Sequence, residues 1–348
     1  MWRGGLGDSM DFATSSHRRR WLYTRASLDE ERRRLQQRLV EGVRKQRAAA
    51  DPGQPEAGSA TKRPREPSPV DPVGELLMLK YYQQIIQEKC REMRLPLKVM
   101  STALQYHKRF FLRHSSMEFD PGRVMITAIF MATKIEEHYT RAADIAAAFD
   151  VSEDLVVKQE VALLEGLNFD LVVHSPYRAL QGFVQELRDA RTSPPSSSGS
   201  PPPPPLPTAS SAASLPPPDE ALLSAPEPLV AEACRAAFGA LDALMLSDAP
   251  LLFGPAQLAA AALRSGFKTK GIRIPNFLAR LALRAAAAAA AEDGSSSGLE
   301  AEQQQLPSDP AAALTAALDE LDALGSEGAR RVEVGEVKEA NAVAREWR

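Results

Sequence analysis

Apolar residues recur every three or four positions along most of the chain, a spacing that places them on one face of an α-helix. The densest block begins at Pro72. Within it, Asp120 and Pro121 form a start signal, because Asp can cap a helix and Pro suits its first position. From Val124 to Ala132 every residue but one is apolar, which predicts a central helix surrounded by others.

Two further helices complete this block after the central one. A short Ala-rich helix is expected near 142–149, and Asp150-Val-Ser-Glu153 resembles a capping box that starts a fifth helix. The fifth helix carries apolar residues on one face, at Val157, Val161, Leu164 and Leu167. Five helices joined by short loops, with the third buried, form one compact domain.

A second helical block begins at Pro176 and is interrupted by low-complexity sequence. Residues 192–218 contain a proline run and few core-forming side chains, which predicts a disordered insertion near 192–228. Gly254-Pro255 predicts the start of a helix that Gly266 ends. Further helices are expected at about 230–244, 275–291, 310–324 and 332–348, with Gly325 as a stop signal and a second insertion near 292–308.

The pattern therefore predicts an all-α chain with two helical domains and additional helices at both ends. The predicted parts are a basic arm with one helix and a disordered linker at 1–71, a first domain at 72–175, a second domain with both insertions at 176–331, and a carboxyl-terminal helix at 332–348. The arm's helix is expected to start at the capping-box pattern Ser27-Leu-Asp-Glu30 and to run to about Ala49. Its apolar stripe is thin, so it needs a larger surface to pack on.

Charge and cysteine content narrow the class of function. The net charge is −3, yet residues 1–65 carry fifteen Lys and Arg against eight Asp and Glu, which leaves the rest of the chain at −10. A basic arm on an acidic body argues against a broad nucleic-acid-binding core. The two cysteines, Cys90 and Cys234, are too far apart in sequence for a zinc ribbon or a disulfide scaffold. No apolar run has the length of a signal peptide or membrane span, so we expect a cytosolic or nuclear protein without membrane contact.

Motifs for catalysis are not found in the sequence. It contains neither GxxxxGK[ST] nor a strand-linked GxGxxG, and its five histidines form no HExxH pair. Many of the serines lie in linkers, no Ser-His-Asp arrangement is evident, and Glu136-Glu137 has the composition of a solvated helix end. We therefore expect a protein that is not an enzyme and that holds no cofactor or metal.

Two charged residues stand out because they interrupt apolar patterns. Lys134 closes the apolar third helix, and Glu160 lies among Val156, Leu164 and Leu167 at helical spacing. A buried, unpaired charge is costly, so each must reach water or a partner. One interpretation is structural: Lys134 is a cation at a helix end, and Glu160 lies at the edge of the core. The other is a protein-binding surface with two opposite charges.

Several stretches decide between these interpretations because they resemble the cyclin family, and within it the cyclin H branch. They are Ser15-Ser-His-Arg-Arg-Arg-Trp21, Lys80-Tyr-Tyr82, Tyr106-His-Lys-Arg-Phe-Phe111, Ser116-Met-Glu-Phe119, Leu167-Asn-Phe-Asp-Leu-Val-Val-His-Ser-Pro-Tyr-Arg178 and Leu246-Ser-Asp-Ala-Pro-Leu-Leu252. The resemblance covers about 15–191 throughout, 229–283 well, and the remainder in outline. It implies tandem cyclin boxes of five helices each, flanked by terminal helices that pack on the first box.

The resemblance also implies a function. It describes a regulatory subunit that binds and activates a cyclin-dependent kinase, here the CDK-activating kinase, which acts on kinase activation loops and on the tail of RNA polymerase II within TFIIH. From the same resemblance we also expect a third assembly subunit and a nuclear location. We expect no direct binding of nucleic acid. The implied kinase contacts are Met131, Lys134, Ile135, Glu160 and Leu164. The substrate-docking signature of cell-cycle cyclins has no counterpart in Glu75–Arg94, and the 192–228 insertion departs from the compact second box of cyclin H.

Other interpretations and minor motifs stay open at this point. A cyclin C type of transcriptional cyclin is the nearest alternative, and a cyclin-fold transcription factor of the TFIIB type is a further one. Lys62, Arg63 and Arg65 form a candidate nuclear import signal, although short basic runs also arise by chance. Ser68, Ser193 and Ser200 each precede proline and are candidate phosphorylation sites, although exposed Ser-Pro pairs are common in disordered segments.

Overall fold

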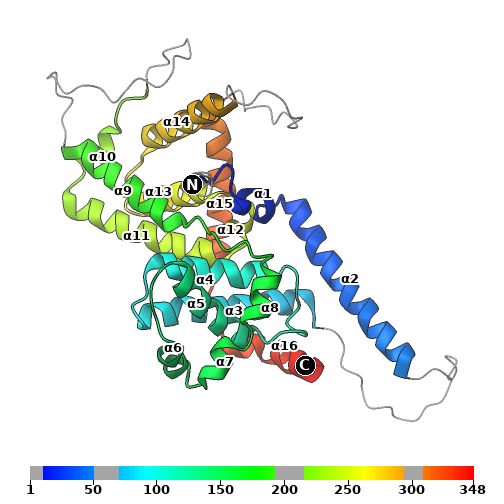
Figure 1. The fold of residues 1–348 in the computed structure, drawn as a ribbon. Coiled ribbons are helices and arrows are strands. Elements are labelled where there is room, and N and C mark those ends of the chain that lie inside the picture. The colour runs from blue at the N-terminus through cyan, green and yellow to red at the C-terminus, as the bar shows by residue number, and fades with distance from the viewer. Residues whose placement is uncertain (1–10, 51–69, 193–214, 294–308) are drawn as a thin grey trace, which may run out of the picture. The chain divides into compact units, whose positions relative to one another are not determined.

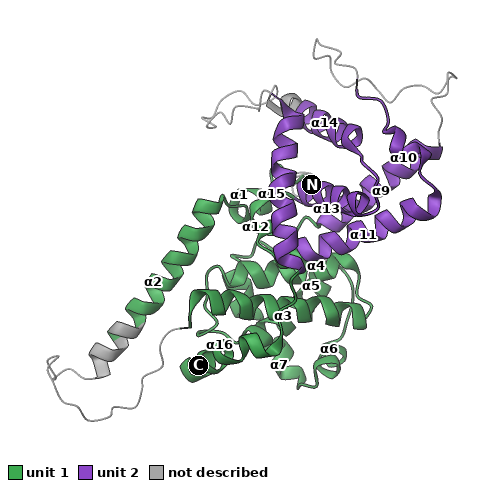
Figure 2. Ribbon diagram, turned by 180° about the vertical axis from the view of Figure 1, so that it is seen from behind, with its two compact units in different colours: residues 1–175, 245–254, 330–348 green, residues 176–244, 255–329 purple. Residues whose placement is uncertain are grey.

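The computed structural model of the chain describes residues 11–50, 70–192, 215–293 and 309–348, and every regular element among them is an α-helix (Figure 1). The all-α prediction is therefore confirmed. The chain divides into two compact units, which Figure 2 colours separately. Unit 1 comprises residues 1–175, 245–254 and 330–348, and unit 2 comprises 176–244 and 255–329. No helix in the described ranges is both long and apolar enough to cross a membrane.

Unit 1 is built around a buried central helix, α5. Its helices are α1 (Ser16–Trp21), α2 (Arg25–Ala50), α3 (Pro72–Glu92), α4 (Leu97–Phe110), α5 (Pro121–Ile135), α6 (Ala142–Phe149), α7 (Glu153–Val157), α8 (Glu160–Gly166), α12 (Ala249–Leu252) and α16 (Val334–Trp347). Helix α5 packs against α3, α4, α6, α7 and α8, and Val124–Ala132 is buried throughout, as its apolar run predicts. Asp120 caps α5 by accepting a hydrogen bond from the Gly122 N–H at 2.9 Å.

Helix α4 is also buried nearly all round, although its sequence is not uniformly apolar. Every residue from Val99 to Phe110 is buried, including several polar ones. Lys108 donates to Gln83 Oε1 at 2.6 Å, and the His107 ring lies 3.3 Å from the Pro121 carbonyl oxygen. These contacts engage two of the buried polar side chains, and apolar periodicity alone underestimates how deeply α4 is buried.

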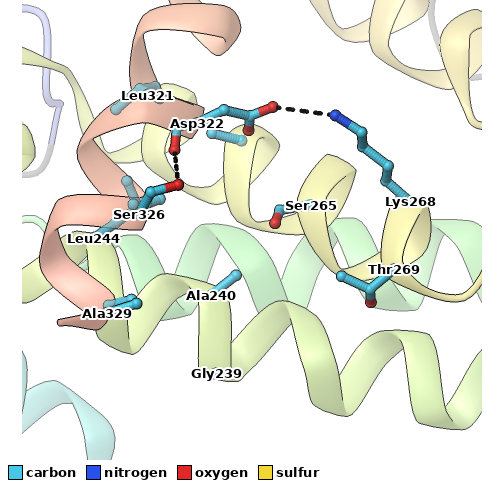
Figure 3. Close-up of a pocket in the computed structure, with 13 residues that line it drawn as sticks. Gly239, Ala240, Leu244, Ser265, Lys268, Thr269, Leu321, Asp322, Ser326 and Ala329 are labelled. Carbon is cyan, nitrogen blue, oxygen red and sulfur yellow. Dashed lines mark hydrogen bonds and ion pairs between the residues drawn. The ribbon is translucent and has the colours of Figure 1, made fainter. Parts of the chain in front are cut away.

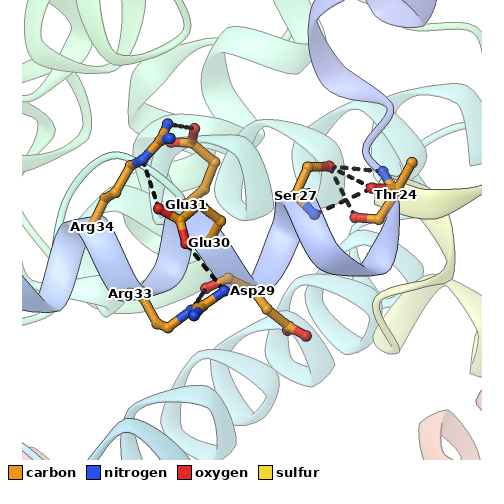
Figure 4. Close-up of polar contacts among 7 residues, drawn as sticks. All are labelled: Thr24, Ser27, Asp29, Glu30, Glu31, Arg33 and Arg34. Atoms are coloured by element: carbon orange, nitrogen blue, oxygen red, sulfur yellow. Dashed lines mark hydrogen bonds and ion pairs between the residues drawn. The ribbon is translucent and has the colours of Figure 1, made fainter.

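The terminal helices α2 and α16 belong to unit 1, where α16 packs against α3, and the start of α2 differs from the prediction. Thr24 and Ser27 form reciprocal bonds: Ser27 N–H donates to Thr24 Oγ1 at 3.2 Å, and Thr24 N–H to Ser27 Oγ at 2.8 Å (Figure 4). Thr24, not Ser27, therefore occupies the cap position, and the helix begins earlier than predicted. Arg32 joins α2 to Asp248 through two hydrogen bonds of 2.8 and 2.6 Å.

The predicted fifth helix is two helices, α7 and α8, separated by a turn at residues 158–159. Asp150 does not cap α7, because it adopts a left-handed conformation that ends α6 (φ 52°), and Ser152 precedes α7 without a side-chain cap. Because of this break, the residues predicted to share one apolar face do not all face the core. Val157 and Val161 are 40% and 66% exposed, whereas Leu163 belongs to the core.

Unit 2 contains α9 (Pro176–Thr192), α10 (Glu220–Ser224), α11 (Glu227–Leu246, whose last two residues fall in unit 1), α13 (Pro255–Thr269), α14 (Pro275–Asp293) and α15 (Pro310–Ala329). Helix α13 packs against α9 and α15. The predicted insertion near 192–228 is too long at its carboxyl end: Leu222 of α10 is fully buried, and Asp219 accepts hydrogen bonds from the backbone of Asn276 and Phe277 at 2.9 and 2.8 Å. Most of the second predicted insertion lies outside the described residues.

Neither predicted glycine stop in unit 2 ends its helix. Gly266 lies inside α13, and a Cβ there would stand 2.3 Å from the Ala237 backbone nitrogen. Gly325 lies inside α15, which continues to Ala329. The first glycine is thus explained by the close approach of α11 to α13, a tertiary contact that the local sequence does not reveal.

Candidate functional site

Lys134 and Glu160, the two charges that interrupt apolar patterns, form an ion pair with each other. Lys134 is the next-to-last residue of α5, and Glu160 is the first residue of α8. The Lys134 Nζ donates to Glu160 Oε1 and lies 4.3 Å from the centroid of the Phe130 ring. The side chains remain 44% and 25% exposed. The structure therefore joins the two residues, and Lys134 does not pair with the nearby Glu137 or His138.

The local chain positions both groups. Helix α5 ends just beyond Lys134, because Glu137 adopts a left-handed conformation (φ 53°) and the His138 N–H closes the helix on the Thr133 carbonyl at 2.8 Å. Glu136 is held apart from the pair by Thr102, whose hydroxyl donates to Glu136 Oε1 at 2.6 Å. Glu160 lies in the first turn of α8, where the helix dipole favours a carboxylate.

The three apolar residues predicted to contact a kinase differ in how much surface they offer. Ile135 is 36% exposed, and Leu164 is half-buried. Met131 is only 5% exposed and packs in the core with Leu163 and Leu167, so its side chain supports the surface from beneath.

The sequence interpretation did not identify four apolar side chains of unit 1 as exposed. Val157, Val161 and Phe169 are 40%, 66% and 66% exposed, and Tyr139 is fully exposed. The backbone of Phe169 is bonded to α8, because its N–H donates to the Leu164 carbonyl at 2.9 Å. Its backbone is left-handed (φ 57°), as is that of Asn168 (φ 53°), a conformation that non-glycine residues rarely adopt. The position of the break between α7 and α8 could not be read from periodicity, so these side chains were assigned to the core or left unassigned.

Among the described residues, His17, His107 and Cys90 are deeply buried. Burial lowers the pKa of His17 to about 2 and that of His107 to about 3, and it raises the pKa of Cys90 to about 12. In the described ranges, no group of three or more His, Cys, Asp or Glu side chains is arranged to hold a metal ion. The candidate import residues Lys62, Arg63 and Arg65 and the candidate phosphorylation sites Ser68, Ser193 and Ser200 lie outside those ranges.

A hollow of about 610 Å³ in unit 2 also lacks catalytic geometry (Figure 3). Small side chains of α11, α13 and α15 line most of it. Of its polar groups, Asp322 pairs with Lys268 at 3.9 Å, and the Ser326 hydroxyl donates to the Asp322 backbone carbonyl at 3.0 Å. A serine bonded to its own helix and a lysine whose charge is paired with a carboxylate do not form an activated nucleophile.

The described residues thus form an all-α protein whose first unit carries an ion pair and several exposed apolar side chains. The cyclin N-terminal domain family matches residues 63–172. Cyclin-H1-1 of Arabidopsis thaliana is 32% identical over 263 residues, which cover 73% of this chain and 70% of that protein. The chain belongs to the cyclin family.

Other relatives extend the comparison to the cyclin H branch. Cyclin CCL1 of Saccharomyces cerevisiae is 30% identical over 53% of this chain, and Cyclin-H of Xenopus laevis is 29% identical over 63%. The matches span 47% and 61% of those two proteins, less than two thirds of their lengths. A chain of the CAK complex from Chaetomium thermophilum shares the fold, with a TM-score of 0.63 at 17% identity over 97% of this chain and 88% of that one. A chain of the yeast TFIIK complex also shares the fold, with a TM-score of 0.57 at 21% identity. The match covers 90% of this chain and 100% of that one.

Proposed function

We propose that the chain is a regulatory cyclin of the cyclin H type, which binds and activates a cyclin-dependent kinase and has no catalytic activity of its own. The observation that carries the proposal is the Lys134–Glu160 pair, flanked by the exposed side chains of Ile135, Val161 and Phe169. A polar pair surrounded by exposed apolar side chains is the arrangement of a protein-docking surface. Cyclin membership favours this function over a TFIIB-type factor.

The mechanism follows from what an inactive kinase lacks. Such a kinase has its αC glutamate away from the β3 lysine, so the ion pair that orients the ATP phosphates is broken. The surface around Lys134 and Glu160 would bind the αC helix only in its inward position. Binding energy then shifts the kinase population toward the active arrangement, with no chemistry required of the cyclin.

The wider assembly is proposed from the relatives. The yeast TFIIK complex contains Kin28, Ccl1 and Tfb3, and the CAK complex of Chaetomium binds an ATP analogue. By similarity, this chain would join a kinase and a third subunit within TFIIH and would act on activation loops and on the polymerase tail. That role places it in the nucleus, where the basic run from Lys62 to Arg65 would serve import, and Ser68, Ser193 and Ser200 would be substrates of a proline-directed kinase.

Charge reversal separates docking from folding. Lys134→Glu or Glu160→Lys alone removes an exposed ion pair, which is worth about 0–1 kcal/mol of stability. The same changes should weaken kinase binding by about 2 kcal/mol or more, roughly 30-fold, because the pair would be desolvated against the kinase. The double variant restores the internal ion pair with reversed polarity, so its stability should recover while kinase binding should not.

The assay is titration calorimetry with the kinase that co-purifies with the full chain, alongside thermal unfolding. Phe169→Ala tests the apolar flank and should weaken binding with little effect on melting. The double variant Glu41→Lys/Lys45→Glu reverses another exposed pair, 3.0 Å apart on α2, and is the matched control. Recovery of kinase binding in the Lys134–Glu160 swap would show that the pair is structural only and would contradict the proposal.

A further inference from the structure

The end of α13 in unit 2 repeats the end of α5 in unit 1. Both helices have fifteen residues, begin with proline and carry lysine as their next-to-last residue, Lys134 in one and Lys268 in the other. Three residues beyond each lysine the backbone is left-handed, at Glu137 (φ 53°) and Gly271 (φ 73°). The fold thus presents a lysine at the same position of the corresponding helix in both units.

The closing hydrogen bonds are repeated as well. In α5 the His138 N–H donates to the Thr133 carbonyl at 2.8 Å, and in α13 the Ile272 N–H donates to the Phe267 carbonyl at 3.0 Å. Each bond closes the last turn in the same way, so the chain leaves both helices in the same direction relative to the helix axis.

The two lysines differ in how firmly they are paired. Lys134 is bonded directly to Glu160, whereas Lys268 stands 3.9 Å from Asp322 and is 75% exposed. Asp322 is already held by Arg264 at 3.0 Å. The Lys268 charge is therefore only weakly neutralised and faces solvent.

An apolar hollow of about 460 Å³ lies beside Lys268, between α13, α14 and α15. The residues at its base are at most 8% exposed: Ile272, Ile274, Leu278 and Leu318. Arg273 is exposed on its rim, and among the described residues no ion pair neutralises it. The volume falls within the range of about 300–1,000 Å³ that is typical of ligand sites.

Charge determines what fits this hollow. The stretch from Leu263 to Ile274 holds four cations and no acidic residue. Asp319 and Asp322 of α15 also line the hollow and pair with Arg264, and Lys270 pairs with Glu232 at 2.9 Å, which leaves Lys268 and Arg273 as the weakly paired cations. An occupant with apolar side chains and carboxylates complements the apolar base of the hollow and these two cations.

We propose that this hollow of unit 2 binds an acidic, amphipathic helical segment of a partner protein other than the kinase. Its apolar side chains enter the hollow over Ile272 and Leu318, and its carboxylates face Lys268 and Arg273. An amphipathic helix in a groove anchors through residues at spacings of three and four, which suits one compact apolar hollow with charge along its edge. The location of the site is independent of the proposed function. The inference that its occupant is helical rests on the proposed function, in which the corresponding end of α5 binds a kinase helix.

The probe is an 18-residue synthetic helix labelled with fluorescein, with leucines on one face and glutamates beside them, titrated with the full chain and followed by anisotropy. The same peptide with lysine in place of glutamate, and a scrambled peptide of equal composition, should each bind at least tenfold more weakly. Equal binding of either would overturn the proposal. Displacement of the acidic peptide by a single-stranded oligonucleotide would also overturn the proposal, because the surface would then bind any anion whether or not it has apolar side chains.

Variants locate the binding. Lys268→Glu/Arg273→Glu should weaken the acidic peptide at least tenfold, and Leu314→Glu, at the half-buried lip of the hollow, should do the same. Lys270→Glu is the matched control, because it reverses a charge on the same segment outside the hollow and should leave affinity unchanged. Kinase binding should be normal in every one of these variants. Failure of the peptide site can therefore be distinguished from failure of the proposed kinase docking. Unchanged peptide affinity in the double variant would refute the site.

Discussion

Trp21, the last residue of α1, anchors the amino-terminal segment to unit 1. Its side chain is fully buried, and its indole N–H donates to Asp170 Oδ2 at 3.1 Å. The guanidinium groups of Arg109 and Arg113 lie 5.2 and 4.7 Å from the indole ring centroid, within the range of cation–π attraction. Two variants separate these contributions, Trp21→Ala and Trp21→Phe.

The magnitudes follow from what each variant removes. Trp21→Ala deletes a fully buried ring and leaves a cavity, which costs about 3–5 kcal/mol. Trp21→Phe retains most of the apolar contact but loses the indole hydrogen bond. Asp170 still has Arg20 at 3.2 Å and is not left unpaired, so this loss is worth about 1 kcal/mol in addition to a smaller packing loss. The order of stability should be wild type, then Trp21→Phe, then Trp21→Ala.

The assay is urea unfolding followed by circular dichroism, with hydrogen exchange of the backbone amides in Ser16–Trp21. Both the free energy of unfolding and the protection of α1 should fall in the predicted order. Tyr139→Ala, at a fully exposed aromatic residue, is the control and should change stability by less than about 0.5 kcal/mol. If Trp21→Ala costs less than about 1 kcal/mol and leaves α1 protected, burial of the indole does not hold the segment.

Two further predictions concern glycine and histidine. Gly266→Ala should destabilise unit 2 by about 1–3 kcal/mol, because its Cβ would meet the Ala237 backbone, whereas Gly182→Ala in α9 has open space and should stabilise by about 0.5–1 kcal/mol. Scanning calorimetry compares the two, and shifts of the same sign would contradict the packing argument. Burial, with a smaller contribution from Lys108, lowers the pKa of His107 to about 3, while its bond to the Pro121 carbonyl opposes the shift. The unfolded state therefore binds the extra proton first, so stability is complete above about pH 6.5 and falls by about 1 kcal/mol per pH unit below it. His107→Gln should flatten urea midpoints measured between pH 7.5 and 5, and parallel profiles for variant and wild type would refute this.

The elements that could be predicted carry their signals locally. Asp120 and Pro121 specify the start of α5 through a side-chain cap and a fixed backbone angle, and both lie within one turn of the helix they begin. The helix at Ala142–Phe149 was likewise evident from its own composition. Signals of this kind do not depend on what the helix packs against.

The elements that were mispredicted depend on contacts between distant residues. Gly266 has the composition of a helix stop, but the space for its missing side chain is taken by α11. The break between α7 and α8 places Val157 and Val161 in solvent, although their spacing matches a continuous buried face. Periodicity reports which residues share a face, and it cannot report where a helix is interrupted by its neighbours.

The candidate site was only half predictable for the same reason. Sequence spacing identified Lys134 and Glu160 as anomalous, each on its own helix. Their pairing joins residues that are 26 positions apart and required the packing of α8 against α5. Phe169 gave no periodic signal at all, because its exposure arises from two consecutive left-handed residues in a loop.

The loop that carries Phe169 connects the amino-terminal anchor to the proposed docking surface. Left-handed backbone at two non-glycine residues costs roughly 1–2 kcal/mol each, and such strain persists only where surrounding contacts fix it. Here Asp170, the next residue, is bound by the Trp21 indole, and the Tyr106 hydroxyl donates to the Leu171 carbonyl at 2.6 Å. These buried bonds hold the loop from behind while Phe169 points into solvent. Trp21→Phe should therefore weaken kinase binding although Trp21 lies outside the docking surface, whereas a loop indifferent to Asp170 would leave that affinity unchanged.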